Sequence, residues 1–308
     1  MAGEAHYYGG QAVLEGVMMR GRDHWAVAVR RPDASVHVES HHIRSIGDRI
    51  RILRRPLLRG VIALGQALSI GLRALTISAN QSVEDENQLS TSQMAISMTL
   101  AFVVFTAVFI VGPFVGFRLL RHSVSSGIAR NLLEGLVRVL LFLGYIALIG
   151  RLKEIRRVFQ YHGAEHKTIA AFEHQDRLEP DAVDRYSTLH VRCGTNFLLI
   201  VMVLAIVVYA LFPAKGLLWG ILSRVIAIPL IAGISFELLR LGARYTDAPV
   251  MRAIMAPGLW LQKITTRPPD HSQIEVAIAS FQEVLRREAE EAAGAEAPPT
   301  VTERPEPS

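Results

Sequence analysis

Long charge-free apolar runs alternate with polar segments along this chain, and two of the runs are long enough to cross a lipid bilayer. Residues 95–117 are rich in Phe, Val and Ile, residues 195–212 are rich in Leu, Ile and Val, and neither run contains a charged side chain. A hydrocarbon core about 30 Å thick is crossed by roughly 20 consecutive apolar residues in a helix. Each run therefore predicts a transmembrane helix.

Two further apolar runs contain charged residues. Residues 132–149 include Glu134 and Arg138, and residues 216–236 include Arg224. Because a charge inside a span is costly, we expect these side chains to lie near span ends and to reach the lipid headgroups, with a shared polar cluster in one leaflet as the alternative. With these two runs, the chain has four predicted transmembrane helices.

Residues 56–79 are apolar in bulk, but their polar positions form a pattern. Arg59, Gln66 and Arg73 recur every seven residues and so share one helical face, opposite a stripe of leucine and valine. This pattern predicts an amphipathic helix that lies in the membrane interface. The alternative is a fifth span, which would put the N-terminus on the other side of the membrane.

Basic residues near the span ends predict the orientation in the cell membrane. Residues 151–157 hold four Lys and Arg residues, whereas the loop between the third and fourth spans holds only Lys215. By the positive-inside rule, residues 151–194 and both termini are expected in the cytoplasm. Three arginines between the first two spans would then lie outside, which counts against this orientation.

The polar segments carry structural signals of their own. Residues 25–31 and 35–39 alternate around a Pro-Asp turn and predict a β-hairpin. Ser272 and Glu275 resemble a capping box ahead of apolar residues at helical spacing, which predicts a helix. Beyond residue 292, Ala, Glu and Pro predominate and predict a disordered tail.

The expected fold class is mainly α: a polytopic membrane protein with about four transmembrane helices, interfacial amphipathic helices and a small N-terminal β-hairpin. Its expected segments, in chain order, are a cytoplasmic N-terminal segment with the hairpin (1–55), an interfacial amphipathic helix and acidic loop (56–94), transmembrane helices 1 and 2 (95–150), a cytoplasmic His-rich loop (151–194), transmembrane helices 3 and 4 (195–239), cytoplasmic C-terminal helices (240–292) and a disordered tail (293–308).

Composition supports the membrane class and restricts the partners. Half of the 308 residues are hydrophobic, and the net charge of +5 comes largely from arginines near the spans, which suits contact with anionic lipid. The chain has no nucleic-acid motif, so the lipid bilayer is the expected partner and nucleic acid is not; a homo-oligomer is left open.

The polar first ten residues do not resemble a signal peptide. A single cysteine, Cys193, excludes an intramolecular disulfide.

One polar loop contains a pattern typical of metal sites. His162, Glu165 and His166 form an H-x-x-E-H sequence, the inverted order of the common zinc-protease signature. On a helix the two histidines lie one turn apart on the same face, where both could bind one metal ion. In that pattern the glutamate acts as the general base.

A second pair of candidate ligands precedes the third span. His190 and Cys193 stand three residues apart, and imidazole and thiolate are the ligands that zinc prefers. Glu173 or Glu237 could complete the site, although each is more simply explained as a solvated carboxylate. The alternative to a metal site is a set of interfacial polar residues, with the histidines hydrogen-bonded to backbone and Cys193 packed as a small hydrophobe.

The segment Gly9–Arg20, GGQAVLEGVMMR, combines glycines with polar side chains. We interpret it as a turn that packs against the membrane domain, because glycines permit positive φ and close approach of backbone. The functional alternative is that Gln11, Glu15 and Arg20 line the same cleft as the histidines.

Three sequence stretches together resemble one protein family. GGQAVLEGVMMR, YHGAEHK at 161–167 and HVRCGT at 190–195 are similar to the YqhQ-like family of bacterial membrane proteins, with Val191 in place of a proline. The resemblance covers nearly the whole chain apart from the tail. It implies a bacterial, multi-pass membrane protein and a predicted metal-dependent enzyme without an established reaction, and the family's histidine motifs match His162, Glu165, His166, His190 and Cys193.

Two functions compete at this point. The first is a zinc-dependent hydrolase at the cytoplasmic membrane surface, in which His162 and His166 bind the metal, His190 or Cys193 adds a ligand, and Glu165 activates water. The second is a non-enzymatic membrane scaffold or transporter-like protein, with a structural metal site or none. A closed four-ligand site would favour the second function, because catalytic sites keep one position open.

Overall fold

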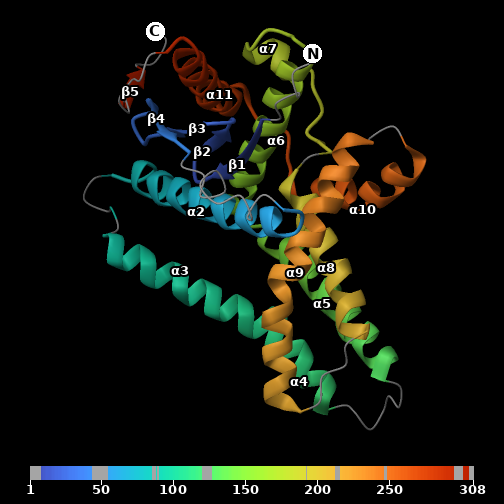
Figure 1. Cartoon of the computed structure of the whole chain (residues 1–308). Helices are drawn as coiled ribbons and strands as arrows, with labels where there is room; N and C mark the ends of the chain where they lie inside the picture. Colours follow the sequence, from blue (N-terminus) through green and yellow to red (C-terminus); the bar gives the residue numbers. More distant parts are fainter. Residues whose placement is uncertain are drawn as a thin grey trace.

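The structure is a computed structural model that describes residues 8–43, 55–84, 88, 90–119, 127–191, 193–211, 216–245, 248–294 and 301–304. A helical bundle forms one end of the molecule, and a β-sheet flanked by helices forms the other (Figure 1). The bundle consists of the π-helix η3 (Ala107–Val111), α4 (Gly112–Leu119), α5 (Gly127–Ile149), α8 (Gly194–Leu211) and α9 (Leu217–Arg244), and α3 (Thr91–Thr106), which leads into η3, extends away from it (Figure 1).

Five helical stretches of the described residues are long and apolar enough to cross a membrane, which confirms the mainly α, multi-pass class. Four of them correspond to the four predicted spans: Ser92–Gly116, Asn131–Ile149, Gly194–Leu211 and Leu218–Gly242. The fifth, Leu58–Gln81, is the segment for which sequence left an interfacial helix and a fifth span as alternatives.

That fifth stretch forms α2 (Leu58–Gln81), which runs across the upper end of the bundle, beneath the sheet (Figure 1). Its three polar positions all contact protein: Arg59 pairs with Glu237 of α9, Gln66 accepts a hydrogen bond from Arg20 (2.6 Å), and the Arg73 guanidinium lies 5.7 Å from the centre of an indole ring. Large apolar residues of α2, such as Leu68 and Leu72, are exposed. This arrangement favours the interfacial helix over a span.

The sheet is an antiparallel meander of β1 (Gly9–Val13), β2 (Gly16–Arg20), β3 (His24–Arg30) and β4 (Val36–His42), with β5 (Val301–Arg304) beside β4. The predicted hairpin is confirmed as β3–β4, in which Arg30 pairs with Val36.

The glycine-containing segment is a second hairpin, β1–β2, and not the turn that its sequence suggested. The chain reverses at Leu14-Glu15, where Glu15 has a φ of 49°. A Cβ on Gly16 would lie 2.2 Å from the Ala28 carbonyl oxygen, so only glycine allows β2 to approach β3 this closely.

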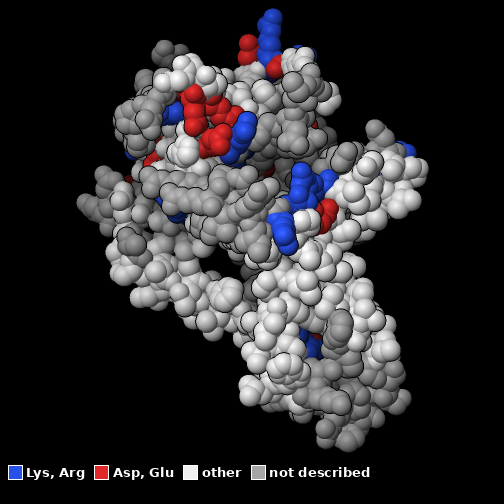
Figure 2. All heavy atoms as spheres, in the orientation of Figure 1, with Lys and Arg blue, Asp and Glu red and all other residues white. Residues whose placement is uncertain are grey.

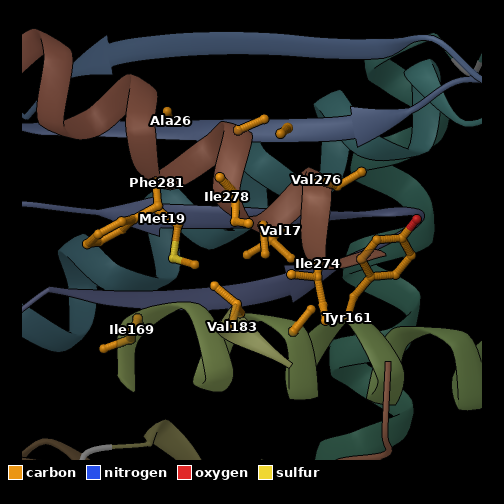
Figure 3. Packing of buried hydrophobic residues seen from close by; sticks show 14 of the residues in the cluster. Val17, Met19, Ala26, Tyr161, Ile169, Val183, Ile274, Val276, Ile278 and Phe281 are labelled. Atoms are coloured by element: carbon orange, nitrogen blue, oxygen red, sulfur yellow. The ribbon is translucent and has the colours of Figure 1, made fainter. Parts of the chain in front are cut away.

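Both faces of the sheet are covered by helices, and side chains alternate between the two cores. One core joins β2 to α6 (Lys153–Glu173) and α11 (His271–Ala292), and Figure 3 shows side chains of these three elements meeting in it. The other core joins the opposite face to α2, with Trp25, Val27 and Val29 of β3 buried against it. The sheet is therefore buried on both sides, as in a three-layer sandwich.

The C-terminal helix begins two residues earlier than its sequence signal. Asp270 is the N-cap of α11 and forms a capping box with Gln273, so the prediction of Ser272 and Glu275 in these roles was wrong. The wrong choice has a simple cause, since both pairs have capping-box spacing and only Asp270 lies where the chain leaves its extended conformation.

Within the tail predicted to be disordered, Val301–Arg304 pair with β4, and residues 295–300 and 305–308 lie outside the described residues. Residues 85–87 of the expected acidic loop also lie outside them.

Three charged side chains meet inside the bundle instead of reaching the headgroups. Arg224 donates to both carboxylate oxygens of Glu134 (3.2 and 2.9 Å), and Arg138 donates to Glu134 Oε1 (2.8 Å) and to the Phe109 carbonyl oxygen of η3 (2.9 Å). All three side chains are buried. On the face that Figure 2 shows, the charged atoms of the described residues in the lower bundle lie within a hollow. The expectation of side chains extended to the headgroups was therefore wrong, and the shared polar cluster is correct, because partners on a neighbouring helix satisfy the charges.

Candidate metal centre

The two histidines of the H-x-x-E-H sequence lie on one face of α6. His162 and His166 are separated by one helical turn, and their ring centres are 4.4 Å apart. This part of α6 packs beneath β1 and α11, so most side chains from Tyr161 to Ile169 are buried. Within the segment expected as a His-rich loop, residues 153–173 thus form a helix, which is the condition on which the pairing of the two histidines depends.

Backbone carbonyl groups fix the orientation of both imidazoles. Nδ1 of His162 lies 2.9 Å from the carbonyl oxygen of Thr265, and Nδ1 of His166 lies 2.5 Å from that of Thr188. A carbonyl oxygen can only accept, so each Nδ1 carries the proton and donates it. The Nε2 atom of each ring is therefore left with its lone pair, which is the form of histidine that binds metals.

A cysteine sulfur lies close to the two histidines. Nε2 of His162 lies 3.2 Å from Sγ of Cys193. Nε2 of His166 is buried and has no hydrogen-bond partner among the described residues. Burial also lowers the pKa of His166 well below its usual value, so this ring is neutral at pH 7.

Gly163 makes these carbonyl contacts possible. A Cβ at this position would lie 2.1 Å from the carbonyl oxygen of Arg267 and 3.2 Å from Cγ2 of Thr188. The segments that supply the Thr265 and Thr188 carbonyls thus both cross α6 at its glycine. A side chain there would force them away from the imidazoles.

Cys193 is held where α8 begins. Its Sγ lies 3.2 Å from Oγ1 of Thr195 and accepts a hydrogen bond from the Thr195 backbone N–H (3.4 Å). Burial raises the pKa of the Cys193 thiol, while these contacts at the helix N-terminus oppose the rise. A cation beside the sulfur would favour the thiolate further.

Two buried amides hold the chain that leads to Cys193. Gln262 accepts from the His190 backbone N–H and donates to its carbonyl oxygen, both at 2.8 Å. Asn196 donates to the carbonyl oxygen of Val191 (2.6 Å). These contacts tie the segment before α8 to α10 (Pro249–Thr265).

Together, His162, His166 and Cys193 offer three ligand atoms that all lie within 4.8 Å of one another. Two imidazole nitrogens and one thiolate are a donor set typical of zinc, and three protein ligands leave one tetrahedral position open. The buried, unpartnered Nε2 of His166 fits a bound cation, which would supply the partner that this atom lacks. We call these three residues the metal centre, after the ion that their atoms could bind.

Glu165 lies on the same helix and is also buried. Burial is the main cause that raises its pKa, to about 8; Cys193 raises it further, while His162 and a hydrogen bond from the Gly10 backbone N–H lower it. A Cβ on Gly10 would lie 2.9 Å from Cγ and Cδ of Glu165, so β1 packs directly on this carboxyl group. The glycine-containing segment therefore contacts the predicted general base, but through backbone.

His190 lies next to the metal centre without joining the three-atom group. Its ring centre is 5.7 Å from that of His166, and its Nε2 lies 3.3 Å from Oε2 of Glu173. Burial lowers the pKa of His190. Its role as a metal ligand stays a prediction.

The other sequence candidates have different partners. Glu237 pairs with Arg59, and Arg20 donates to Gln66. Glu15 accepts from Nε of Arg157 on α6 (2.5 Å), and Gln11 packs against Gly71 of α2. The residues that sequence analysis missed, Thr188 and Thr265, act through backbone carbonyls, which leave no signal in a sequence.

Comparisons with known proteins cover most of the chain. Residues 55–287 match the family described as "Protein of unknown function (DUF1385)", and this stretch contains every predicted ligand. The chain is 37% identical over 297 residues to the "Uncharacterized protein YqhQ" of Bacillus subtilis (strain 168), a match that covers 92% of this chain and 93% of that protein. No solved structure matches the chain.

Proposed function

As its YqhQ-like motifs predicted, this chain belongs to the DUF1385 family of proteins of unknown function, and from its own residues we propose that it is a zinc-dependent hydrolase. His162, His166 and Cys193 bind the metal ion, and Glu165 is the general base. The positive-inside rule puts the site at the cytoplasmic surface of the membrane. The observation that carries the proposal is the pair of Nδ1–H groups donated to carbonyl oxygens, which leaves two Nε2 lone pairs beside a cysteine sulfur.

Each residue has a defined task in this proposal. A bound zinc ion supplies Lewis-acid chemistry and makes water a nucleophile near neutral pH. The carbonyls of Thr265 and Thr188 orient the imidazoles, a contact whose loss typically weakens metal binding about 10–100-fold. Glu165 accepts the proton of the attacking water, and a dication nearby lowers the pKa of this buried carboxyl group so that it is ionised.

Metal analysis of the purified protein tests the metal centre. We expect close to one zinc per chain in the parent, and background levels in His162→Ala and Cys193→Ser. His174→Ala is the matched control, because His174 is an exposed histidine at the C-terminal end of the same helix. Background metal in the parent, or unchanged metal in the two ligand variants, would remove the proposal.

Glu165→Gln separates a hydrolase from a structural site. The variant keeps the shape of the side chain and the metal, but it loses the base, so hydrolysis of a 4-nitrophenyl ester should fall by about 10²–10⁴-fold. An unchanged rate would show that Glu165 is not the base.

A structural metal in a non-enzymatic scaffold is the second candidate. It is favoured by the burial of His166 and Cys193, and by His190, which lies close enough to become a fourth ligand after a small shift. Substitution with Co²⁺ distinguishes the two, because azide changes the visible spectrum of an open site and leaves that of a closed four-ligand site unchanged.

A further inference from the structure

Helix α10 is apolar on both of its sides. Its inner side packs mainly on α8, with Met255, Gly258 and Leu261 buried. Its outer side exposes Val250 (68%) and Trp260 (67%). Large apolar side chains on the outer side of a helix do not suit contact with water there.

The position of α10 explains what covers that outer face. Its Gly258 packs on Asn196 in the first turn of α8, where a Cβ on the glycine would lie 2.0 Å from Oδ1. Exposed apolar residues continue the surface on both neighbouring spans, with Leu198 on α8 and Leu241 on α9. In Figure 1, α10 projects sideways from the upper end of the bundle. The outer face of α10 is thus continuous with the surface of two candidate membrane spans.

The composition of the outer face matches the headgroup layer. Tryptophan is enriched at this depth of a bilayer, and long basic side chains extend from it to the headgroups. Trp260, Arg252 and Lys263 are all exposed on α10. The positive charges of Arg252 and Lys263 are complementary to anionic lipid.

The same helix is connected directly to the metal centre. The carbonyl of Thr265, in its last turn, orients His162, and Gln262 holds the backbone of His190. A cavity of about 140 Å³ lies between α10 and Val191, two residues before Cys193, and it is lined by Val191, Met251, Arg252, Met255 and Leu259. Four of these five side chains are apolar.

We propose that α10 lies in the headgroup layer and that the substrate of the metal centre is an anionic amphiphile drawn from the membrane. Its apolar chain occupies the cavity beside Val191, and Arg252 binds its anionic head. This assignment rests on the proposed function, because it names the substrate of that site. A water-soluble substrate would use neither the apolar cavity nor the lipid-facing helix.

Quenching of tryptophan fluorescence tests the position of α10 without any metal. The full chain is placed in vesicles of phosphatidylcholine and phosphatidylglycerol that carry bromine at a shallow or a deep acyl position. The difference between the parent and Trp260→Phe isolates the signal of Trp260. We expect stronger quenching by the shallow bromine, and no quenching by either lipid would overturn the placement.

The substrate class is tested on the Co²⁺-loaded chain in phosphatidylcholine nanodiscs. Dihexanoyl phosphatidylglycerol should change the cobalt spectrum at a concentration at least tenfold lower than inorganic phosphate does. Leu259→Trp fills the cavity and should abolish this difference, whereas Ala253→Trp places the same new side chain on the outer face and should preserve it. A retained cobalt spectrum reports an intact centre in both variants.

The outcomes separate the two proposals. Equal effects of the lipid and of phosphate, or a preference that survives Leu259→Trp, overturn the substrate class and leave the metal centre in place. A chain that binds no cobalt removes the proposed function and the substrate with it, while the quenching result still decides where α10 lies.

Discussion

Gly163 shows how one missing side chain can determine the chemistry of a site. The two segments that orient the imidazoles cross α6 at this residue, and the 2.1 Å distance from its hypothetical Cβ to the Arg267 carbonyl allows no substitution without movement. The glycine of the H-G-A-E-H sequence therefore belongs to the site as much as its histidines do.

Gly163→Ala should weaken metal binding while the chain still folds. The added methyl group displaces the 265–268 segment and with it the carbonyl that fixes His162, so we expect the metal dissociation constant to rise about 10–100-fold. Competition with a chromophoric chelator measures this constant. Gly65→Ala is the control, because nothing lies within 4 Å of that Cβ, and an equal loss in both variants would contradict the role of Gly163.

Glu39 makes the stability of the sheet dependent on pH. The imidazoles of His37 and then His41, which contact its carboxylate, lower its pKa to about 2 from a usual value of 4.5. A lowered carboxyl pKa means that the stabilisation is complete above pH 4.5 and is lost as the pH falls toward 2.

Glu39→Gln should therefore destabilise the fold by roughly 1–3 kcal/mol at pH 7. The difference in melting temperature between the parent and this variant should shrink between pH 4.5 and pH 2. A difference that stays constant over this range would contradict this role of the two imidazoles, of which His41 lies 2.8 Å from the Glu39 carboxylate.

At the scale of elements, periodicity predicted the long helices and missed the short buried strands. The four spans and α11 have long apolar runs or a 3.6-residue repeat, which a sequence displays directly. The strands β1 and β2 have five residues each; β1 begins with two glycines and β2 is buried at its first four positions, so polar and apolar residues do not alternate along them.

The candidate site shows the same division. His162, His166, Glu165 and Cys193 were identified because their side chains are chemically distinctive, and their spacing of four residues on a helix placed the histidines together. The long-range contacts could not be predicted in this way, since Thr188 and Thr265 contribute carbonyl groups that every residue has. Sequence alone likewise could not predict that Cys193 would lie closer to the two histidines than His190 does, because long-range packing sets these distances.

The charged cluster of α5 and α9 should respond unequally to the loss of its members. Glu134 is the carboxylate that both arginines share, so Glu134→Gln leaves two buried guanidinium groups without an ion-pair partner, whereas Arg224→Gln leaves the Glu134–Arg138 pair intact. Breaking a buried ion pair typically costs about 3–5 kcal/mol, so Glu134→Gln should be the more destabilising change. Thermal unfolding in detergent compares the two, and equal or reversed effects would contradict this account of the cluster.

At the scale of the whole molecule, the metal centre lies where the sheet, the bundle and α10 meet. α6 carries the histidines and packs on β1, α8 begins immediately after Cys193, and α10 ends at the Thr265 carbonyl. A change in any of these three parts would alter the distances between ligands. The proposed site of hydrolysis is therefore in direct contact with a candidate membrane span, α8.

Zinc K-edge X-ray absorption of the purified chain tests the central claim most directly, because it reports the atoms bound to the metal. The proposed centre predicts one sulfur at about 2.3 Å and two imidazole nitrogens at about 2.0–2.1 Å, with one further light atom, and the sulfur contribution should disappear in Cys193→Ser. A shell made only of oxygen, or a chain that retains no zinc, would contradict the metal centre of His162, His166 and Cys193.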